Sequence, residues 1–309
     1  MCRPHDELCS MLLCLHSLTR GQISAGSGPH VQAAFLDIVR QADPALAARL
    51  HEPNLRRPYT LGLFKDTAAA PCPPRGHLIY GQQAFEIKPG QICWLRITTL
   101  DYSVFSSFVP YLMALGTTPQ VRIGQLYFAI SHLLLTPVAQ PEALAGWTAR
   151  SSFAELATLE PARRRYCFHF ASPTAFSRGQ KAWGKLLKLF PEPADVFESL
   201  GRQWENFAPT ELSLSAAGLS PHCIATWCED NLSISQYHLE TCHLSAHKFG
   251  LPGFQGTITY EVKGQLDATQ ACWLTTLARF ALFSGAGYKT TMGMGQTRCI
   301  DLPAYIALE

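Results

Sequence analysis

The segment SGAGYKTTMGMGQTR, residues 284–298, places four glycines within eleven positions. Glycine allows a positive φ and lets a backbone approach a ligand without interference from Cβ. Successive N–H groups in such a loop can bind phosphate oxygens, and two cations lie beside them. The segment therefore predicts a polyanion-binding loop, with an ordinary glycine-rich turn as the alternative. The candidate ligand-binding residues are Gly285, Gly287, Lys289, Gly293, Gly295 and Arg298.

The elements expected around this loop exclude a nucleotide-cofactor site. The glycine spacing lacks the G-x-x-x-x-G-K-[ST] of a P-loop. An apolar helical pattern at 267–283 precedes the loop and a strand pattern at 295–302 follows it. A dinucleotide fingerprint has the opposite order, with the strand first and the helix N-terminus facing the phosphate. No cofactor is expected.

Composition indicates a packed globular protein. The chain has 309 residues, 47% of them hydrophobic and 16% charged, which suits two domains with their own cores. The net charge of +2 is too small to mark the whole protein as a nucleic-acid binder, so any polyanion site must be local. Eleven cysteines, an odd number with irregular spacing, exclude a complete disulfide framework and favour a reducing cytoplasm. No apolar run reaches membrane-spanning length, so we expect a soluble, cytoplasmic protein without a membrane partner.

Hydrophobic patterns predict an α+β protein in which the same unit occurs twice. In the first half, strands are expected at 8–18, 58–64, 76–87, 91–99 and 121–135, and helices at 31–42, 44–50 and 102–115. In the second half, strands are expected at 164–172, within 222–247, at 253–262 and at 295–302, and helices at 195–208 and 267–283. Pro110 should kink or divide its helix, and Asp267 should cap the last one. This order resembles the split β-α-β arrangement of ferredoxin-like domains.

Several segments together resemble one known family. They are the glycine-rich segment, CFHFASPTAFSR at 167–178, LPGFQGTITYEV at 251–262 and AAFLDIVRQADPALAARLHEP at 33–53. Their sequence and order are similar to the CRISPR-associated endoribonucleases that cut precursor CRISPR RNA within each repeat, members of the repeat-associated mysterious protein (RAMP) superfamily. The resemblance implies two tandem ferredoxin-like (RRM-like) domains. The expected division is 1–150, with the candidate catalytic histidines, and 151–309, with the glycine-rich loop.

The resemblance also implies an activity and partners. CRISPR repeat RNA should bind between the domains and be cut without a metal ion, leaving a 2′,3′-cyclic phosphate or 3′-phosphate and a 5′-OH. Other CRISPR-associated effector subunits, and a monomeric or homodimeric state, remain open. A non-catalytic RNA-binding subunit of a CRISPR effector complex is the alternative function.

Metal-free RNA cleavage needs proton transfer to and from the ribose and stabilisation of a charged phosphorane. Histidine suits the proton transfers near neutral pH. His51 is the first candidate, because the resembling enzymes carry a histidine after a short helix in a stretch that matches Leu50, His51 and Glu52 here. A helix C-terminus favours its cationic form. The alternative is a histidine that only caps helix carbonyls.

His30 and Arg57 are the other catalytic candidates. His30 follows GSGP and precedes a helix, whose positive end favours a neutral ring; a helix cap explains it equally well. The resemblance places Arg57 where some members have a lysine that stabilises the transition state, and arginine can clamp a phosphate there. The position that is tyrosine in certain members is Leu36 here. A tyrosine-histidine-lysine set is therefore incomplete, which keeps the non-catalytic alternative open.

Further cations and a cluster of possible zinc ligands complete the candidates. Arg178 and Lys181 are expected to contact RNA, and the spacing of Lys181, Lys185 and Lys188 predicts one face of a helix at 181–189. The possible zinc ligands are Cys223, Cys228, Cys242 and His243. They lack a paired C-x-x-C, and strand alternation separates their side chains, so no metal site is predicted.

Overall fold

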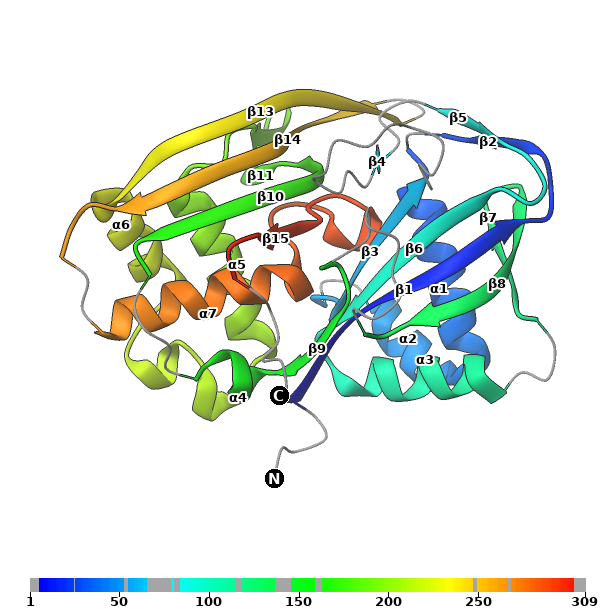
Figure 1. Cartoon of the computed structure of the whole chain (residues 1–309), viewed down its shortest axis with the longest axis horizontal. Helices are drawn as coiled ribbons and strands as arrows, with labels where there is room; N and C mark the ends of the chain where they lie inside the picture. Colours follow the sequence, from blue (N-terminus) through cyan, green and yellow to red (C-terminus); the bar gives the residue numbers. More distant parts are fainter. Residues whose placement is uncertain are drawn as a thin grey trace.

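The chain folds into two similar halves that lie side by side (Figure 1). This computed structural model describes residues 6–24, 26–52, 55–65, 79–80, 84–114, 118–136, 146–158, 163–246, 249–265 and 268–302. Asp267, the expected cap of the last helix, lies outside the described residues. Within the described part of the chain, no helix is both long and apolar enough to cross a membrane.

The N-terminal half is an antiparallel sheet with helices on one face. Its elements are β1 (Glu7–Ser17), β2 (Gly21–Ile23), α1 (Gly28–Ala42), α2 (Pro44–His51), β3 (Tyr59–Lys65), β4 (Ile79–Tyr80), β5 (Phe85–Ile87), β6 (Ile92–Thr99), α3 (Tyr102–Ala114), β7 (Gln120–Ile123), β8 (Leu126–Leu134) and β9 (Ala149–Ser152). The sheet order is β4-β3-β6-β1-β8-β7, with β9 also paired to β1. Nearly every residue of β1 is buried, because both faces of this sheet are covered.

The C-terminal half repeats the plan. Its elements are α4 (Phe153–Leu156), β10 (Arg165–Thr174), β11 (Phe176–Lys181), β12 (Gly184–Lys188), α5 (Pro193–Phe207), the 3₁₀ turns η3 (Thr210–Leu212) and η4 (Ser215–Ala217), α6 (Pro221–Asn231), β13 (Leu232–Ala246), β14 (Phe249–Val262), α7 (Ala268–Ser284), the 3₁₀ turn η5 (Thr290–Met292) and β15 (Thr297–Cys299). The four-stranded sheet has the order β13-β14-β10-β15, and β11 and β12 form a separate hairpin.

Both sheets have the ferredoxin-like strand order. If the four main strands of each half are numbered along the chain, their order across the sheet is second, third, first, fourth, with antiparallel neighbours. The α+β prediction of two tandem ferredoxin-like domains is confirmed.

The two halves share one packing layer. One core lies between the N-terminal sheet and its helices α1 and α3. The opposite face of the same sheet, including Leu12, Phe64 and Trp94, belongs to a second core with the C-terminal half. The end of α7 packs on β1, β3 and β6 in that layer. The glycine loop, residues 285–296, begins where this helix ends.

Four details of the predicted elements were wrong. The stretch 181–189 is not a helix but the second part of the β11–β12 hairpin, because Gly179 and Gly184 take positive φ and the chain reverses there. The expected strand at 121–135 is the hairpin β7–β8, turned at Gly124, whose φ is 62°.

The other two concern helices. The segment 222–247 begins as α6, because the Ser220 side chain caps it and Pro221 fits its first turn. The strand starts only at Leu232. Pro110 was expected to kink or divide its helix, and the division is wrong, because α3 runs from Tyr102 to Ala114 with this proline inside.

The glycine loop folds back on the protein. Its Ala286 amide donates to the Gly295 carbonyl over 2.9 Å, and the Gly295 amide donates to the Pro173 carbonyl over 3.0 Å. The Gly287 amide donates to Ser199 Oγ over 2.9 Å, and the Gly285 amide donates to the Ala281 carbonyl over 3.0 Å. Three of the four candidate glycine amides therefore serve the protein's own packing.

The loop also reaches the N-terminal half. Its 3₁₀ turn η5 packs on β3 and on the start of α1. A β-carbon on Gly28, in the first turn of α1, would lie only 2.0 Å from the Met292 carbonyl oxygen. The loop from one half thus rests directly on a helix N-terminus of the other.

This packing predicts an unequal cost for adding one methyl group at two glycines. Gly295 and Gly90 have positive φ, 69° and 84°. A β-carbon at Gly295 would lie 2.1 Å from the Ala286 oxygen, whereas at Gly90 it would meet nothing within 4 Å. We expect Gly90→Ala to lower the free energy of unfolding by about 1 kcal/mol, from backbone strain alone. Gly295→Ala should lower it by about 2–4 kcal/mol, because overpacking adds to the strain.

Urea unfolding of both variants and the wild type measures this difference. Equal losses in the two variants would show that the loop is not closely packed in solution.

Candidate RNA-cleavage site

His51 ends the short helix α2 with one ring nitrogen fixed. Asp43 caps this helix by accepting a hydrogen bond from the Leu46 amide over 2.9 Å, and Pro44 starts it. The predicted cap, first position and helix-terminal histidine are confirmed. His51 Nδ1 lies 3.0 Å from the Ala47 carbonyl oxygen. Since a carbonyl only accepts, Nδ1 carries a proton and Nε2, on the other side of the exposed ring, is available for proton transfer.

Arg57 lies beside His51. Its Nε donates to the carbonyl oxygen of Leu50 over 3.0 Å, so it caps the end of α2 one residue before the histidine. The side chain is half-buried. Its bond to Leu50 uses one of the five guanidinium N–H donors. The structure therefore brings two of the three predicted catalytic residues together.

A buried tyrosine connects this pair to α1. Gln32 Nε2 donates to the Tyr59 hydroxyl over 3.0 Å, and the rings of Phe35 and Tyr59 are 4.7 Å apart. Burial raises the pKa of Tyr59, and the nearby positive charge of Arg57 acts against that rise. Tyr59 is fully buried, so it supports α1 and cannot contact RNA. Leu36 also lies in the N-terminal core.

His30 lies on the first turn of α1, at the glycine-loop contact. Gln32, which reaches towards Tyr59, is one turn from Gly28, which contacts Met292. The exposed His30 ring borders a surface hollow of about 260 Å³ with Ser27, Arg122 and Gln125. His30 thus lies on α1 and His51 at the end of α2, a separate short helix that packs on α1. The His51 ring bonds the Ala47 carbonyl and not His30.

The predicted RNA-binding cations have different surroundings. Arg298, on β15, stacks its guanidinium 4.8 Å from the Trp147 ring, and burial lowers its pKa to about 10. It still carries a positive charge at neutral pH, although much of it is buried between the halves. Lys289 precedes η5 with φ 56°, and its Nζ lies 5.4 Å from the Tyr288 ring.

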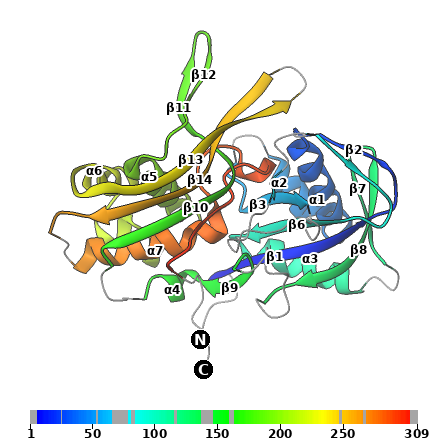
Figure 2. The same cartoon turned by 45° about the horizontal axis from the view of Figure 1, so that its top comes forward.

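The hairpin β11–β12 projects from the body of the protein (Figure 2). Its base is held by buried Asp195 of α5, which pairs with Arg178 and, over 2.6 Å, with Lys188. Lys181 is exposed near the turn, and Trp183 in the turn is 72% exposed. Lys185 Nζ lies 4.6 Å from the Tyr288 ring, so the hairpin adjoins the glycine loop.

Sequence reasoning missed Trp183 and Tyr288. Trp183 stands between Lys181 and Lys185, and Tyr288 precedes Lys289. Aromatic residues interleaved with cations are typical of RNA-binding surfaces. The expected helix at 181–189 concealed that signal, because it gave Trp183 no reason to lie at a tip.

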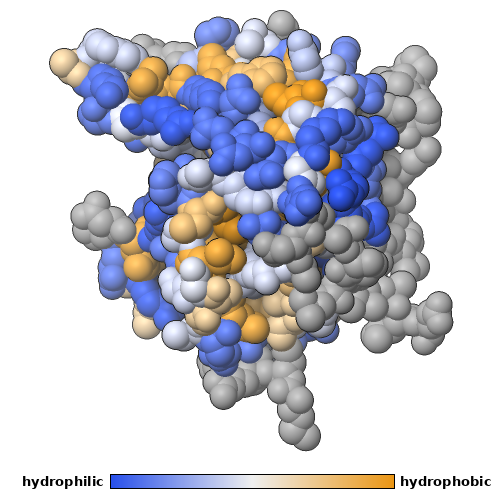
Figure 3. All heavy atoms as spheres, turned by 90° about the vertical axis from the view of Figure 1, so that its left-hand side faces the viewer, coloured by the Kyte–Doolittle hydropathy of each residue, from blue (hydrophilic) through white to orange (hydrophobic). Residues whose placement is uncertain are grey.

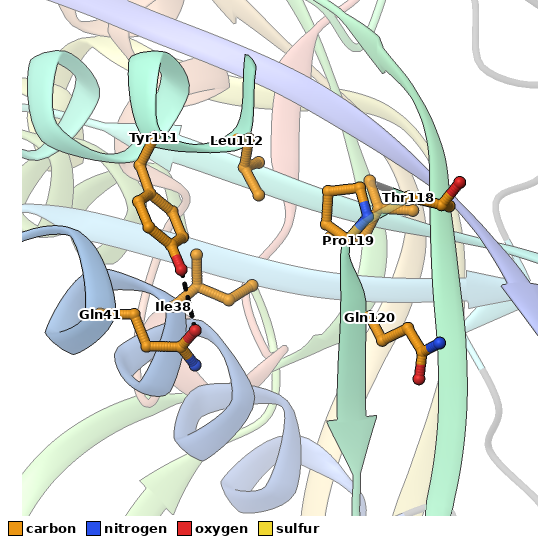
Figure 4. Close-up of a pocket in the computed structure, with 8 residues that line it drawn as sticks. Ile38, Gln41, Tyr111, Leu112, Thr118, Pro119 and Gln120 are labelled. Carbon is orange, nitrogen blue, oxygen red and sulfur yellow. Dashed lines mark hydrogen bonds between the residues drawn. The ribbon is translucent and has the colours of Figure 1, made fainter. Parts of the chain in front are cut away.

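The rest of the described surface can be compared with this site for metal ligands and hollows. Among the described residues, no three His, Cys, Asp or Glu side chains lie close enough to hold a metal ion. A hollow of about 300 Å³ between α1, α3 and β7 is lined by Ile38, Leu112 and Pro119 and by the Tyr111–Gln41 hydrogen bond of 2.9 Å (Figure 4). Seen from the α6 end, hydrophobic residues form separate groups among hydrophilic ones (Figure 3).

Comparison with known proteins gives a consistent result. The curated relatives include CRISPR-associated endoribonuclease Cas6 of Mycobacterium tuberculosis, 30% identical over 148 residues, which are 48% of this chain and 43% of that protein. That of Streptococcus thermophilus is 28% identical over 126 residues, 41% of this chain and 46% of that protein. The chain thus matches less than half the length of these relatives.

Solved structures match over almost the whole chain. A Cas6 product complex superposes with a TM-score of 0.75 at 22% identity, covering 96% of this chain and 100% of that one. Thermus thermophilus Cas6 gives a TM-score of 0.65 at 23% identity, covering 95% and 98%. At these identities the likeness shows the fold.

Two family models divide the chain between them. The CRISPR Cas6 N-terminal domain matches residues 8–158, and the CRISPR-associated endoribonuclease Cas6 model matches residues 168–297. They follow one another in the order of the two ferredoxin-like halves. The chain belongs to the Cas6 family of CRISPR-associated endoribonucleases.

Proposed function

We propose that this chain is an endoribonuclease that binds CRISPR repeat RNA and cuts precursor CRISPR RNA within each repeat, without a metal ion. Support comes from the family, from the Cas6 product and substrate-mimic complexes among its structural neighbours, and from one observation of this chain. That observation is the exposed His51 ring, anchored through Nδ1 beside the half-buried cation Arg57. The nine described cysteines are free thiols, in keeping with a cytoplasmic location.

The proposed reaction uses the ribose 2′-OH as nucleophile. His51 Nε2 takes the proton of that hydroxyl, or, in the cationic form, gives a proton to the departing 5′-oxygen. Arg57 binds the phosphate and stabilises the charge that develops on the phosphorane. His30 is the candidate for the second proton transfer. The products are a 2′,3′-cyclic phosphate, or a 3′-phosphate after hydrolysis, and a 5′-OH.

We propose that the RNA runs over the glycine loop and the hairpin. The segment 176–190 carries four cations and no carboxylate, and Asp195 pairs with two of them. Lys181, Lys185 and Lys289 are left to contact phosphates. Lys289 also keeps a left-handed backbone that costs a non-glycine residue about 1–2 kcal/mol, and such strain often occurs at functional sites. Trp183 is placed to stack on an unpaired base.

One feature favours the second candidate, a binding subunit that does not cut. Leu36 is buried in the N-terminal core, where the resemblance to certain members places a tyrosine. If His51 and Arg57 do not suffice without that hydroxyl, the chain should shift repeat RNA in a gel but leave it intact.

Cleavage in EDTA tests the first candidate. We expect the wild-type protein to cut its repeat RNA with EDTA present and to leave RNA with a 2′-deoxy substitution at the cut site intact. His51→Ala should cut about 10²–10⁴-fold more slowly, because it loses a positioned proton-transfer group. His132→Ala is the matched control, since His132 is another exposed histidine, bonded to Ser131. Equal cutting by wild type and His51→Ala, or of both RNAs, would remove the mechanism.

A binding measurement tests the RNA path. We expect Trp183→Ala to weaken binding of the uncleavable 2′-deoxy repeat RNA by about 5- to 150-fold, the usual effect of losing one base stack. Tyr127→Ala, at a 44% exposed aromatic residue on β8, should leave the dissociation constant unchanged. Filter binding at fixed salt gives both values. An unchanged affinity in Trp183→Ala would place the RNA elsewhere.

A further inference from the structure

The guanidinium of Arg96 joins the last turn of α7, just before the glycine loop, to the last residue of that loop. Arg96 lies mid-way along β6, on the face of the N-terminal sheet that meets the C-terminal half, and is fully buried. Its Nη2 donates to the Leu282 carbonyl, near the end of α7. Its Nη1 donates to the side-chain oxygen of Gln296 over 2.5 Å, where the loop ends. One side chain therefore fixes the entry and the exit of a loop from the other half.

Gln296 extends this connection into the neighbouring strand. Its side-chain Nε2 donates to the Leu61 carbonyl of β3 over 3.1 Å, and its backbone N–H donates to Ser172 Oγ over 2.9 Å. Gly62, opposite Arg96 across β3 and β6, leaves the necessary space, because a β-carbon there would lie 3.0 Å from the Gln296 side chain. The strand that carries this contact begins at Tyr59, which supports α1.

The remaining partners of Arg96 are neutral. Its Nε and Nη2 donate to Ser10 Oγ over 3.1 and 2.9 Å, and the Trp147 carbonyl oxygen is 3.3 Å from Nε. Among the described residues no carboxylate forms an ion pair with Arg96. The partial negative charge at the C-terminal end of α7 is therefore what offsets its positive charge. Burial and the nearby charge of Arg298 lower the pKa of Arg96 to about 9, which still leaves it protonated at neutral pH.

A buried cation without a carboxylate is costly, and apolar replacements of buried charges are often as stable. What an apolar residue cannot supply at this place is a planar fork that binds Leu282 and Gln296 together. The glycine loop rests on the first turn of α1 at Gly28. Gln32 and Phe35, one and two turns further along this helix, contact Tyr59, which lies near Arg57. A small shift of the loop would therefore move any RNA held on it relative to the histidine.

We propose that Arg96 is a positioning residue for RNA cleavage, which acts through Gln296 to fix the glycine loop on α1. This inference rests on the proposed function, because it assigns Arg96 a part in that same reaction. Arg96 contacts no RNA itself, since it is fully buried.

Single-turnover cleavage separates positioning from stability. The variants are Arg96→Lys, which keeps the charge but loses the fork, and Gln296→Met, which keeps Arg96 and removes the amide. Thr98→Val is the matched control. Thr98 lies two residues further along β6 and donates to the Phe283 carbonyl over 2.6 Å, in the same interface and at the same helix end. It contacts Gln296 only indirectly, through Thr60 Oγ1, which is 2.7 Å from Thr98 Oγ1 and 3.4 Å from Gln296 Nε2. Each variant is assayed below its own melting temperature with protein in excess over RNA.

We expect Arg96→Lys and Gln296→Met to cut bound RNA roughly tenfold more slowly or worse, as small misplacements of reacting groups do. Their dissociation constants for the 2′-deoxy RNA should change much less than their rates. Thr98→Val should cut at the wild-type rate even if its melting temperature falls as much as those of Arg96→Lys and Gln296→Met. The double variant should be no slower than the slower single variant, because both act through one contact.

Two results would overturn the inference while leaving the proposed function intact: wild-type cutting rates in Arg96→Lys and Gln296→Met, or rate losses in all three variants that follow their melting temperatures. If the wild-type protein itself binds but does not cut, the proposed function has failed instead. If Arg96→Lys does not fold, Gln296→Met with its control decides alone.

Discussion

A single buried guanidinium holds the junction on which the arrangement of this protein depends. Arg96 comes from the middle of the N-terminal sheet, yet its partners Leu282 and Gln296 lie 186 and 200 residues away along the chain. Each half is a complete ferredoxin-like unit, and nothing in that topology sets the position of one unit on the other. The apolar layer that the halves share holds them together, and the contact between the buried cation, the end of α7 and the loop exit adds a directional constraint to it. Because this contact fixes the glycine loop of one half, it also helps to set where that loop meets α1 of the other half.

The glycine loop acquires a different meaning from this arrangement. Glycine-rich sequence next to lysine suggests amides that bind phosphate, but most of the amides of the loop donate to the protein itself. The glycines are needed because two backbone segments approach too closely for a β-carbon, as at Gly295 and Ala286. We therefore infer that the loop acts first as a platform, and that lysine and aromatic side chains on and beside it, Lys289, Tyr288 and Lys185, make the contacts with RNA.

The sequence predicted local features well where the signal was local. Asp43 and Pro44 mark the start of α2, so the helix-terminal place of His51 could be predicted. Hydrophobic patterns gave the regions of the four main strands of each half. It failed where distant contacts decide. Lysine spacing suggested a helix at 181–189, but two glycines turn the chain and Asp195 anchors the resulting hairpin. Arg96 looked like one arginine in a strand, because its partners could be identified only once both halves were folded.

The central claim is that the RNA backbone held beside the glycine loop reaches the Nε2 atom of His51. A structure of the protein with its repeat RNA, made uncleavable by a 2′-deoxy sugar at the cut site, measures this directly. The account predicts His51 Nε2 within hydrogen-bond reach of the ribose and phosphate at that site, about 3 Å, with Arg57 on the same phosphate. A scissile phosphate bound elsewhere, with His51 facing solvent, would contradict it.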